Sequence, residues 1–555
     1  MFTVGIALCL LAGCSGYARP LAKGSTDSVL DVAAAIRAIV AGGPSAFHPL
    51  TVSEREQLRS LYAGTDAPLW VDAAGRPTSN ARDALTLIGR AADEGLDRTD
   101  YSAASLGQMA AALEGSHATA TDAADFDIAL SVNILSYLRQ LHEGRVDPRA
   151  IGFRMTAPAD DHDFAAILRT ALASHRIGET AAELAPPLAL YRGLRTMLAR
   201  YRSLAADPML ESPLVSATVR PGEPYVGLST LYRRLVALDD LPTDTPVPSE
   251  ASTYNGAVVE AVQRFQRRHG LLPDGVLGKE TQAALRVPLS WRVRQIELAL
   301  ERLRWLPHVG DARLLAVNIP MFHLWGWDQI PENGAPSFGT GVIVGRALNT
   351  QTPVFVEEMR YIIFRPYWNI PPSILRHETL PAIERDPNYL QRQDMEIVSG
   401  PGDNARPVAL TAESIAQLRR GTLRVRQRPG PKNSLGLVKF VFPNDENVYM
   451  HGTPAPQLFS RARRDFSHGC VRVEDPVALA EWVLKEEPAW TRDRILAAMN
   501  GDRSQRVDLT RPIQVILFYV TAVVMPEDGT IRFAEDIYGH DIGLDRALAR
   551  ARVSQ

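Results

Sequence analysis

The stretch of sequence that decides this fold lies near the C-terminal end and reads YMHGTPAPQLFSRARRDFSHGCVRV, residues 449–473. Its two ends are typical of β-strands, so we expect one strand to end at His451 and the next to open at Cys470. Two strand ends joined by a long loop can lie side by side, which is the geometry that a cysteine–histidine pair requires. The stretch therefore predicts that a thiol and an imidazole meet within a β-rich domain.

These residue types point to a nucleophilic cysteine. A thiol needs a base that takes its proton, and the oxyanion formed by its attack on a carbonyl needs hydrogen-bond donors. His451 and His468 flank the loop, and Gly469 would let the backbone and its N–H groups approach a substrate closely. Either histidine alone could instead be a core residue. Zinc bound by His451, His468 and Cys470 is another alternative, but the chain contains no CxxC or HExxH motif to support it.

The N-terminus accounts for two of the three cysteines. Residues 1–20 contain an apolar run that is too short to span a bilayer and that is typical of an export signal. The sequence LAGC, ending at Cys14, resembles the lipobox of bacterial lipoproteins, which implies lipidation of Cys14 and a periplasmic protein anchored to the inner face of the outer membrane. The alternatives are an ordinary cleaved signal or a misplaced start. Cys9 would leave with the signal, so Cys470 would be a single free thiol in an oxidising compartment, as expected of a nucleophile.

Length and composition indicate a soluble protein of several domains. A chain of 555 residues is too long for one hydrophobic core, and 46% hydrophobic with 22% charged residues is an ordinary globular composition. The net charge of −3 gives no reason to expect nucleic acid or an acidic membrane surface as a partner. The chemistry must therefore come from individual motifs.

The N-terminal part of the chain has helical periodicity. ALTLIGRAADEGLD (84–97) and FDIALSVNILSYLRQLHEG (126–144) place apolar residues on one helix face and end at or beside glycines. These apolar faces indicate a packed core. We expect a helical scaffold domain over residues 30–205, with a task that the sequence does not reveal.

A smaller unit follows over residues 218–290. It contains YNGAVVEAVQRFQRRHGLLPDGVLGKETQAAL (254–285), in which Asn255 can cap a helix, Gly270 ends it, and Asp274-Gly275 makes a tight turn. This stretch closely resembles the three-helix peptidoglycan-binding domain of cell-wall hydrolases and transferases. A generic helical bundle is the alternative, although it would not need this spacing of glycine and turn.

The pattern changes to short β-rich runs over residues 308–545. These runs are RLLAVNIPMFHLWGW (313–327), TGVIVGR (340–346), EEMRYIIFRPYWNIPPSI (357–374) and IQVILFYVTAVV (513–524). A helix over 476–485 should begin after the cap Asp475. Residues 375–432 interrupt the runs with helical pieces such as LTAESIAQLRRG (410–421), which indicates an inserted lid. The predicted fold class is multi-domain α+β.

The motifs in this β-rich part resemble one known family. One pair of motifs looks like the signature of the L,D-transpeptidases of the bacterial cell wall, with their YkuD-type catalytic domain. The pair is HGTP followed, after a gap, by SHGCVRV. Four other stretches are similar to segments of the larger, multi-domain members of this family: VIVGR, TPVF, RPYWNIPPSI and PGPKNSLGLVKFVFPN. With the helical region and the peptidoglycan-binding unit, the resemblance covers nearly the whole mature chain.

The resemblance implies a role for each matching residue. Cys470 would be the acyl-accepting nucleophile, His451 its base, and the carbonyl of Gly452 would orient the imidazole. N–H groups around His468, Gly469 and Cys470 would form the oxyanion hole. Arg472 would complete the catalytic set, the alternative being that it only anchors the loop through a carbonyl. The substrate-facing residues would be Ser467, Tyr367, Trp368 and Asn433.

The implied activity is that of a peptidoglycan L,D-transpeptidase. Such an enzyme cross-links diaminopimelate residues of stem peptides through a cysteine thioester, with no metal or organic cofactor. Its partners would be peptidoglycan stem peptides and glycan strands, and carbapenem-type β-lactams would inhibit it. With water as acceptor the activity would be that of an L,D-carboxypeptidase. The alternative from another class is a catalytically inactive peptidoglycan-binding tether.

Overall fold

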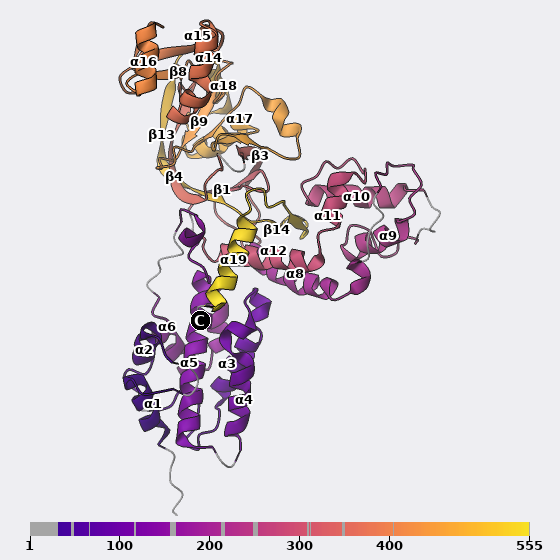
Figure 1. The fold of residues 1–555 in the computed structure, drawn as a ribbon, viewed down its shortest axis with the longest axis vertical. Coiled ribbons are helices and arrows are strands. Elements are labelled where there is room, and N and C mark those ends of the chain that lie inside the picture. The colour runs from indigo at the N-terminus through magenta and orange to yellow at the C-terminus, as the bar shows by residue number, and fades with distance from the viewer. Residues whose placement is uncertain are drawn as a thin grey trace, which may run out of the picture.

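The computed structural model describes most of the chain and places the predicted domains along an elongated molecule (Figure 1). The predicted signal over residues 1–20, with Cys14, lies outside the described residues. The described ranges are 31–45, 49–65, 67–115, 118–155, 162–211, 217–247, 253–307, 310, 312–346, 350–402 and 404–553.

The N-terminal part is an all-helical bundle around one central helix, as predicted. This helix, α5, is buried along most of its length; Thr119 caps its start, and Gly144 follows its last residue. The predicted helix over 84–97 is shorter than expected, because α3 ends at Gly89 and a 3₁₀ turn follows. The helices are α1 (Val32–Ala41), α2 (Val52–Leu61), α3 (Ser79–Gly89), α4 (Ala103–Leu113), α5 (Ala120–Glu143), α6 (Phe164–Ser174), α7 (Ile177–Leu184) and α8 (Ala189–Ala205).

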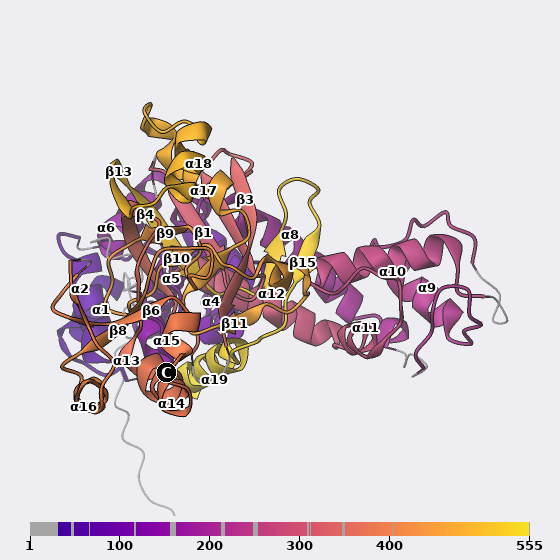
Figure 2. The ribbon, with the colours of Figure 1, turned by 90° about the horizontal axis from the view of Figure 1, so that it is seen from above.

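The next unit is a three-helix domain that projects sideways from the rest of the molecule (Figure 2). It consists of α9 (Leu228–Ala237), α10 (Gly256–Arg268) and α11 (Lys279–Leu285), which enclose an apolar core of their own. Asn255 occupies the N-cap position as predicted, but its side chain makes no capping hydrogen bond. The turn at Gly275 is instead fixed by the buried amide of Gln266, whose Oε1 accepts from the Gly275 N–H at 2.8 Å.

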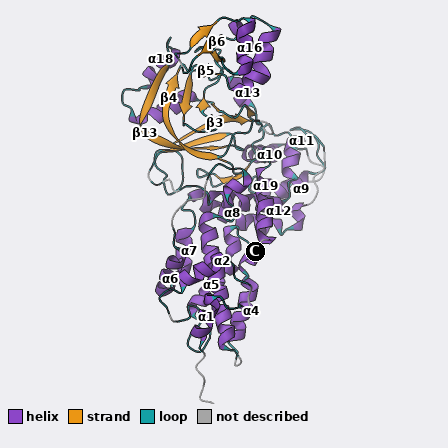
Figure 3. Ribbon diagram, turned by 60° about the vertical axis from the view of Figure 1, so that its left-hand side comes forward, coloured by secondary structure: helices purple, strands orange, loops and turns teal. Residues whose placement is uncertain are grey.

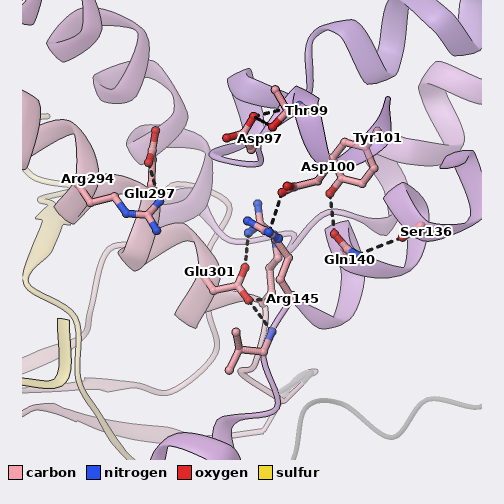
Figure 4. Close-up of polar contacts among 12 residues, drawn as sticks. Asp97, Thr99, Asp100, Tyr101, Ser136, Gln140, Arg145, Arg294, Glu297 and Glu301 are labelled. Carbon is pink, nitrogen blue, oxygen red and sulfur yellow. Dashed lines mark hydrogen bonds and ion pairs between the residues drawn. The ribbon is translucent and has the colours of Figure 1, made fainter. Parts of the chain in front are cut away.

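Helix α12 (Leu289–Leu303) joins the three domains. Close to its C-terminal end, the carboxylate of Glu301 accepts from the backbone N–H groups of Arg145 and Val146, which follow helix α5 (Figure 4). The guanidinium of Arg145 in turn pairs with Asp100 at 2.6 Å, and both side chains are buried. Buried charges that are paired and hydrogen-bonded in this way hold two elements in one geometry, so the helical bundle and α12 form a fixed joint.

The C-terminal half is built on a nine-stranded sheet in the order β11-β3-β12-β10-β9-β4-β13-β1-β2. Strand β2 also pairs with β3, so the sheet closes on itself around an apolar core. Its strands are β1 (Leu314–Asn318), β2 (His323–Trp327), β3 (Phe338–Gly345), β4 (Phe355–Phe364), β9 (Val438–Val441), β10 (Met450–His451), β11 (Asp465–Ser467), β12 (Val471–Val473) and β13 (Gln505–Phe518).

Two of the predicted β-runs are divided in the structure. The run over 357–374 forms β4 and the two-residue β5 (Trp368–Asn369), and the chain becomes helical at Pro372. The run over 513–524 ends β13 and then forms β14 (Ala522–Val524), which pairs with β15 (Ile531–Phe533). Helix α17 (Pro476–Val483) begins after Asp475, whose carboxylate accepts from the Ala478 N–H as a cap. Helices α18 (Arg492–Asn500) and α19 (His540–Val553) complete this half.

A subdomain is inserted in the chain after β4 and before β9, two strands that are neighbours in the sheet. It forms one end of the molecule (Figure 3). It has a four-stranded sheet in the order β5-β8-β6-β7 and its own apolar core. The insertion is longer than expected at its start, because Trp368 already belongs to this sheet. Its other elements are α13 (Pro372–Ile374), a π-helical turn (Leu375–Thr379), α14 (Leu380–Arg385), α15 (Tyr389–Arg392), β6 (Met395–Ser399), β7 (Arg406–Val408), α16 (Ala412–Arg420) and β8 (Arg424–Gln427).

Candidate active site

Sheet register places three basic side chains in one row. His451 of β10 is the partner of Arg472 in the parallel strand β12 and of Lys439 in the antiparallel strand β9. Residues directly opposite one another on adjacent strands point to the same face of the sheet. Cys470 lies two residues before Arg472 in the chain, directly ahead of β12. The row therefore brings the predicted base, the predicted nucleophile and two cations to one face of the sheet.

The imidazole of His451 is held in one tautomer. It is 4% exposed, and its Nδ1 lies 2.5 Å from the carbonyl oxygen of Gly452, as the sequence predicted. Because a carbonyl oxygen can only accept, Nδ1 carries the hydrogen, and Nε2 is the nitrogen that can take a proton. Burial, and after it the charge of Arg472, lowers the pKa of His451 to about 3. The ring is therefore neutral at pH 7, which is the state that a general base requires.

The thiol of Cys470 contacts a backbone carbonyl. Its Sγ lies 3.8 Å from the carbonyl oxygen of Asn447, a residue held in the left-handed region at φ 54°. Burial raises the pKa of the Cys470 thiol, and a bond from the backbone N–H of Tyr449 opposes this increase. The thiol must therefore lose its proton to a neighbouring base before it can attack.

Internal hydrogen bonds fix the loop before Cys470. The hydroxyl of Ser467 donates to the carbonyl oxygen of Cys470 at 2.5 Å and accepts from the Gly469 N–H at 3.2 Å. Gly469 adopts φ 111°, which favours glycine, and its carbonyl oxygen accepts from the Thr352 hydroxyl at 2.8 Å. The Gly469 N–H is thus occupied, contrary to its expected place in an oxyanion hole, and the N–H of Cys470 is the candidate donor. Ser467 is 2% exposed and holds the loop rather than facing substrate.

Among the described residues, no carboxylate forms an ion pair with Arg472. Its Nε is buried without a hydrogen-bond partner. Burial lowers the pKa of the guanidinium, and the neighbouring charge of Arg346 lowers it further. A role as a loop anchor through a carbonyl therefore has no hydrogen bond to support it among the described residues.

His468 contacts the inserted subdomain. Its Nε2 lies 2.7 Å from Oε1 of Glu378, which belongs to the π-helical turn Leu375–Thr379. Both side chains are substantially exposed, at 39% and 55%. The zinc alternative required His468 beside His451 and Cys470, and the described residues contain no group of three metal-binding side chains.

Three further residues predicted to face substrate lie close to the two ends of the insertion and differ in their positions. Trp368 is partly buried and hydrogen-bonds to the hydroxyl of Tyr449, which also hydrogen-bonds to Cys470. Tyr367 lies with its ring 4.1 Å from the guanidinium carbon of Arg426. Asn433 is 1% exposed; its amide nitrogen donates to the Pro366 carbonyl at 3.0 Å, and its Oδ1 accepts from the Leu435 N–H at 2.8 Å. Its amide is therefore used to fix the crossing between insertion and sheet.

Sequence reasoning missed Tyr449, Lys439 and Glu378. A signal for Tyr449 was present, because it precedes His451 by two residues in an extended segment and therefore points to the same face. Lys439 contacts the Tyr449 ring, with Nζ 3.7 Å from its centroid. Neither Lys439 nor Glu378 had a local signal, since each meets the site through pairing with a distant part of the chain.

Comparisons with known proteins match three parts of the chain. Residues 56–198 match the model of the "Scaffold domain", 228–285 that of the "Putative peptidoglycan binding domain", and 312–502 that of the "L,D-transpeptidase catalytic domain". A curated protein of Haemophilus influenzae named "Putative L,D-transpeptidase" is 33% identical over 248 residues, which is 45% of this chain. The match spans about half (48%) of that relative's length.

A solved L,D-transpeptidase structure from Xylanimonas cellulosilytica is 15% identical and covers 55% of this chain and 100% of its own. Its TM-score of 0.16 is too low to support any structural argument. In the part of the chain that the structure describes, no helix combines the length and apolar character needed to cross a membrane. The part of the chain that carries the candidate site, residues 312–502, thus matches the L,D-transpeptidase catalytic domain, and it follows segments that match a scaffold domain and a putative peptidoglycan-binding domain.

Proposed function

We propose that this protein is a periplasmic peptidoglycan L,D-transpeptidase that forms cross-links between diaminopimelate residues of stem peptides. The observation that supports this proposal most strongly is the state of His451: a buried, neutral ring with Nδ1 bound to the Gly452 carbonyl, in the strand that pairs with the one directly after Cys470. A neutral base beside a protonated thiol is suited to transfer a proton as attack begins.

In the first half-reaction, Nε2 of His451 takes the proton of Cys470 while Sγ attacks the carbonyl carbon at the L-centre of the donor's diamino acid. Negative charge moves to the carbonyl oxygen, where the Cys470 N–H can donate a hydrogen bond. The peptide C–N bond then breaks, the terminal D-alanine leaves with the proton from His451, and a thioester remains on Cys470.

In the second half-reaction, the side-chain amine of another stem peptide attacks the thioester. His451 takes the proton from this amine, the C–S bond breaks, and the proton returns to the thiolate, so the enzyme is regenerated. The cycle is ping-pong and needs no redox partner or metal. Water as the acceptor would give the L,D-carboxypeptidase product instead.

The inserted subdomain serves in this proposal as a lid that excludes water from the thioester. Its contact with the site through His468 and Glu378 supports this role. The peptidoglycan-binding domain would hold glycan strands, and lipidation of Cys14 would anchor the protein to the inner face of the outer membrane. Carbapenem-type β-lactams would acylate Cys470, as they present a strained carbonyl to the same nucleophile.

The test is the intact mass of residues 20–555 after incubation with disaccharide-tetrapeptide and, separately, with a carbapenem. We expect a covalent adduct with the carbapenem that is lost in Cys470→Ala, and a cross-linked dimer from the tetrapeptide. Tripeptide without dimer would select the carboxypeptidase. Folded, reduced protein that forms neither adduct nor product would select the inactive peptidoglycan-binding tether.

A further inference from the structure

A buried threonine hydroxyl fixes the carbonyl that directly precedes Cys470. Thr352 is 1% exposed, and its Oγ1 donates to the Gly469 carbonyl oxygen at 2.8 Å and accepts from the Gly345 N–H at 2.9 Å. Because a hydroxyl has one hydrogen and a backbone N–H can only donate, the hydrogen of Thr352 points to the Gly469 carbonyl. The direction of this carbonyl is therefore set by a residue outside the loop that carries Cys470.

The peptide group that this bond anchors also carries the candidate oxyanion donor. The carbonyl of Gly469 and the N–H of Cys470 belong to one planar, trans peptide group, so the two point in opposite directions. Glycine restricts the backbone torsions beside this group less than any other residue would, and Gly469 adopts φ 111°. A hydrogen bond to the carbonyl is therefore needed to hold the group in one orientation, and the same bond aims the Cys470 N–H.

Tyr538 holds Thr352 in place from a distant part of the chain. Its hydroxyl donates to the Gly345 carbonyl oxygen at 2.6 Å and accepts from the Thr352 N–H at 3.2 Å, across 186 positions of sequence. The hydroxyls of Thr352 and Tyr538 thus use both backbone groups of Gly345, at the end of β3. A Cβ added to Gly345 would lie 2.8 Å from the Thr352 nitrogen, so the two backbones are in close contact.

The position of Tyr538 is fixed in turn by a polar network. Its backbone N–H donates to the hydroxyl of Tyr519 at 3.0 Å, and this hydroxyl donates to Oδ1 of Asp536 at 2.7 Å. The Asp536 carboxylate also accepts from the Asp541 N–H at 2.9 Å, in the first turn of α19. The side chain of Asp541 pairs with Arg302 of α12 at 2.5 Å, with both side chains buried. Buried networks of this kind are rigid, so Tyr538 supports Thr352 from a fixed position.

We infer that Thr352 is a positioning residue that aims the Cys470 N–H at the oxyanion, and that Tyr538 supports it. The inference rests on the proposed function and adds to it two residues that act through the backbone. As Sγ bonds to the carbonyl carbon of the donor, an electron pair moves to the carbonyl oxygen, which a correctly aimed N–H stabilises. Loss of Thr352 or Tyr538 should therefore slow the reactions of the thiol that create an oxyanion, and no others.

The experiment compares two reactions of the same thiol in each variant, both followed by intact mass. Acylation by a carbapenem passes through an oxyanion, whereas alkylation by iodoacetamide displaces iodide and forms none. In Thr352→Val, we expect acylation to slow roughly 10- to 100-fold and alkylation to change by about twofold or less, since removing a whole oxyanion donor costs about 100- to 1,000-fold. Thr352→Ser keeps the hydroxyl and should restore most of the acylation rate.

Tyr538→Phe removes the support and leaves Thr352 itself intact. We expect its acylation to slow by roughly two- to tenfold, the effect of about one hydrogen bond, with alkylation unchanged. With disaccharide-tetrapeptide as donor, both Thr352→Val and Tyr538→Phe should lower kcat and leave KM unchanged, because the contact is made only in the transition state. If Thr352→Val does not fold, the ratio of acylation to alkylation in Tyr538→Phe decides the question.

Thr340→Val is the matched control. Thr340 of β3 is 8% exposed, and its hydroxyl accepts from the N–H of Asp475, the cap of α17, at 3.3 Å. Both reactions should proceed in this variant at wild-type rates. Equal slowing of acylation and alkylation in Thr352→Val, or acylation at the wild-type rate, would overturn the inference, and wild-type acylation in Tyr538→Phe would overturn the role of Tyr538. Wild-type protein that iodoacetamide alkylates but neither carbapenem nor tetrapeptide acylates would contradict the proposed function, and the inference with it.

Discussion

Nε2 of His468 lies 2.7 Å from Oε1 of Glu378, so the loop that carries Cys470 is tied directly to the inserted subdomain. The two residues are 90 positions apart in the chain, and Glu378 belongs to a π-helical turn at the start of the insertion. Single π-turns inside α-helices often occur at functional sites. This contact is the direct hydrogen bond through which the proposed lid can act on the loop of the nucleophile.

Removing this contact should change the fate of the thioester. In Glu378→Gln the charge that favours the bond is lost, and we expect a shift toward hydrolysis of up to roughly fivefold, since exposed ion pairs contribute about 1 kcal/mol or less. The measurement is the ratio of tripeptide to cross-linked dimer at fixed donor concentration. Glu384→Gln, which removes a lid carboxylate paired with Arg419, serves as control. An unchanged ratio of tripeptide to dimer in Glu378→Gln would show that the His468–Glu378 contact does not help to exclude water.

His451 should remain neutral well into the acid range. Its folded pKa of about 3 lies below the ordinary value of 6.5, so the ring gains a proton only when the pH falls toward 3. In NMR spectra of the ring nitrogens, we expect no protonation between pH 5 and 8. Arg472→Gln should raise the pKa of His451, because the guanidinium is the largest electrostatic cause of the shift after burial. A titration midpoint of His451 near pH 6.5 in the wild-type protein would contradict the prediction that the ring stays neutral.

The same shift has a consequence for stability. A histidine whose pKa is lowered on folding binds fewer protons in the folded than in the unfolded state between the two pKa values, so stability falls as the pH decreases through that window. Burial also lowers the pKa of His323 and His540, each to about 4. We therefore expect the urea midpoint to decrease steadily from pH 6.5 to pH 4. A urea midpoint that rises or stays level over this range would be inconsistent with three histidines that stay neutral in the folded state.

Tyr449 should assist ionisation of the nucleophile. Its hydroxyl and its backbone N–H both bond to Cys470 and lower the thiol pKa against the effect of burial. Tyr449→Phe removes the hydroxyl alone, so we expect the pKa of Cys470 to rise and acylation to slow about tenfold or more. The rate of alkylation by iodoacetamide as a function of pH measures the pKa directly. Tyr361→Phe on β4 is the control, and equal pH profiles for both variants would rule out this role.

A buried ion pair lies in the three-helix unit over residues 218–290. Asp240 pairs with Arg268 of α10, and their side chains are 3% and 9% exposed. Asp240→Ala leaves the arginine charge buried without its partner, which should destabilise this domain by about 3–5 kcal/mol. Urea unfolding followed by proteolysis within residues 218–290 would detect the loss. Asp239 is an exposed partner of Arg200, so Asp239→Ala should lower the free energy of unfolding by about 1 kcal/mol or less. Similar losses of stability in both variants would refute the prediction that the buried pair matters more than the exposed one.

The sequence by itself predicted the local elements and named the candidate nucleophile and the candidate base. Apolar periodicity predicted α5, the Asp475 cap predicted the start of α17, and the spacing between His451 and Cys470 predicted two strand ends that meet. These features depend on residues close in the chain, where dihedral preferences and capping act directly.

Only the tertiary structure decided which distant residues share the site. The row of Lys439, His451 and Arg472 follows from the register of three strands, and the bond from His468 to Glu378 follows from folding of the insertion over the sheet. The structure also assigned the Gly469 N–H to Ser467. Hydrogen-bond partners such as these are set by long-range packing, because side-chain and backbone donors take whichever acceptor the folded chain brings within about 3 Å.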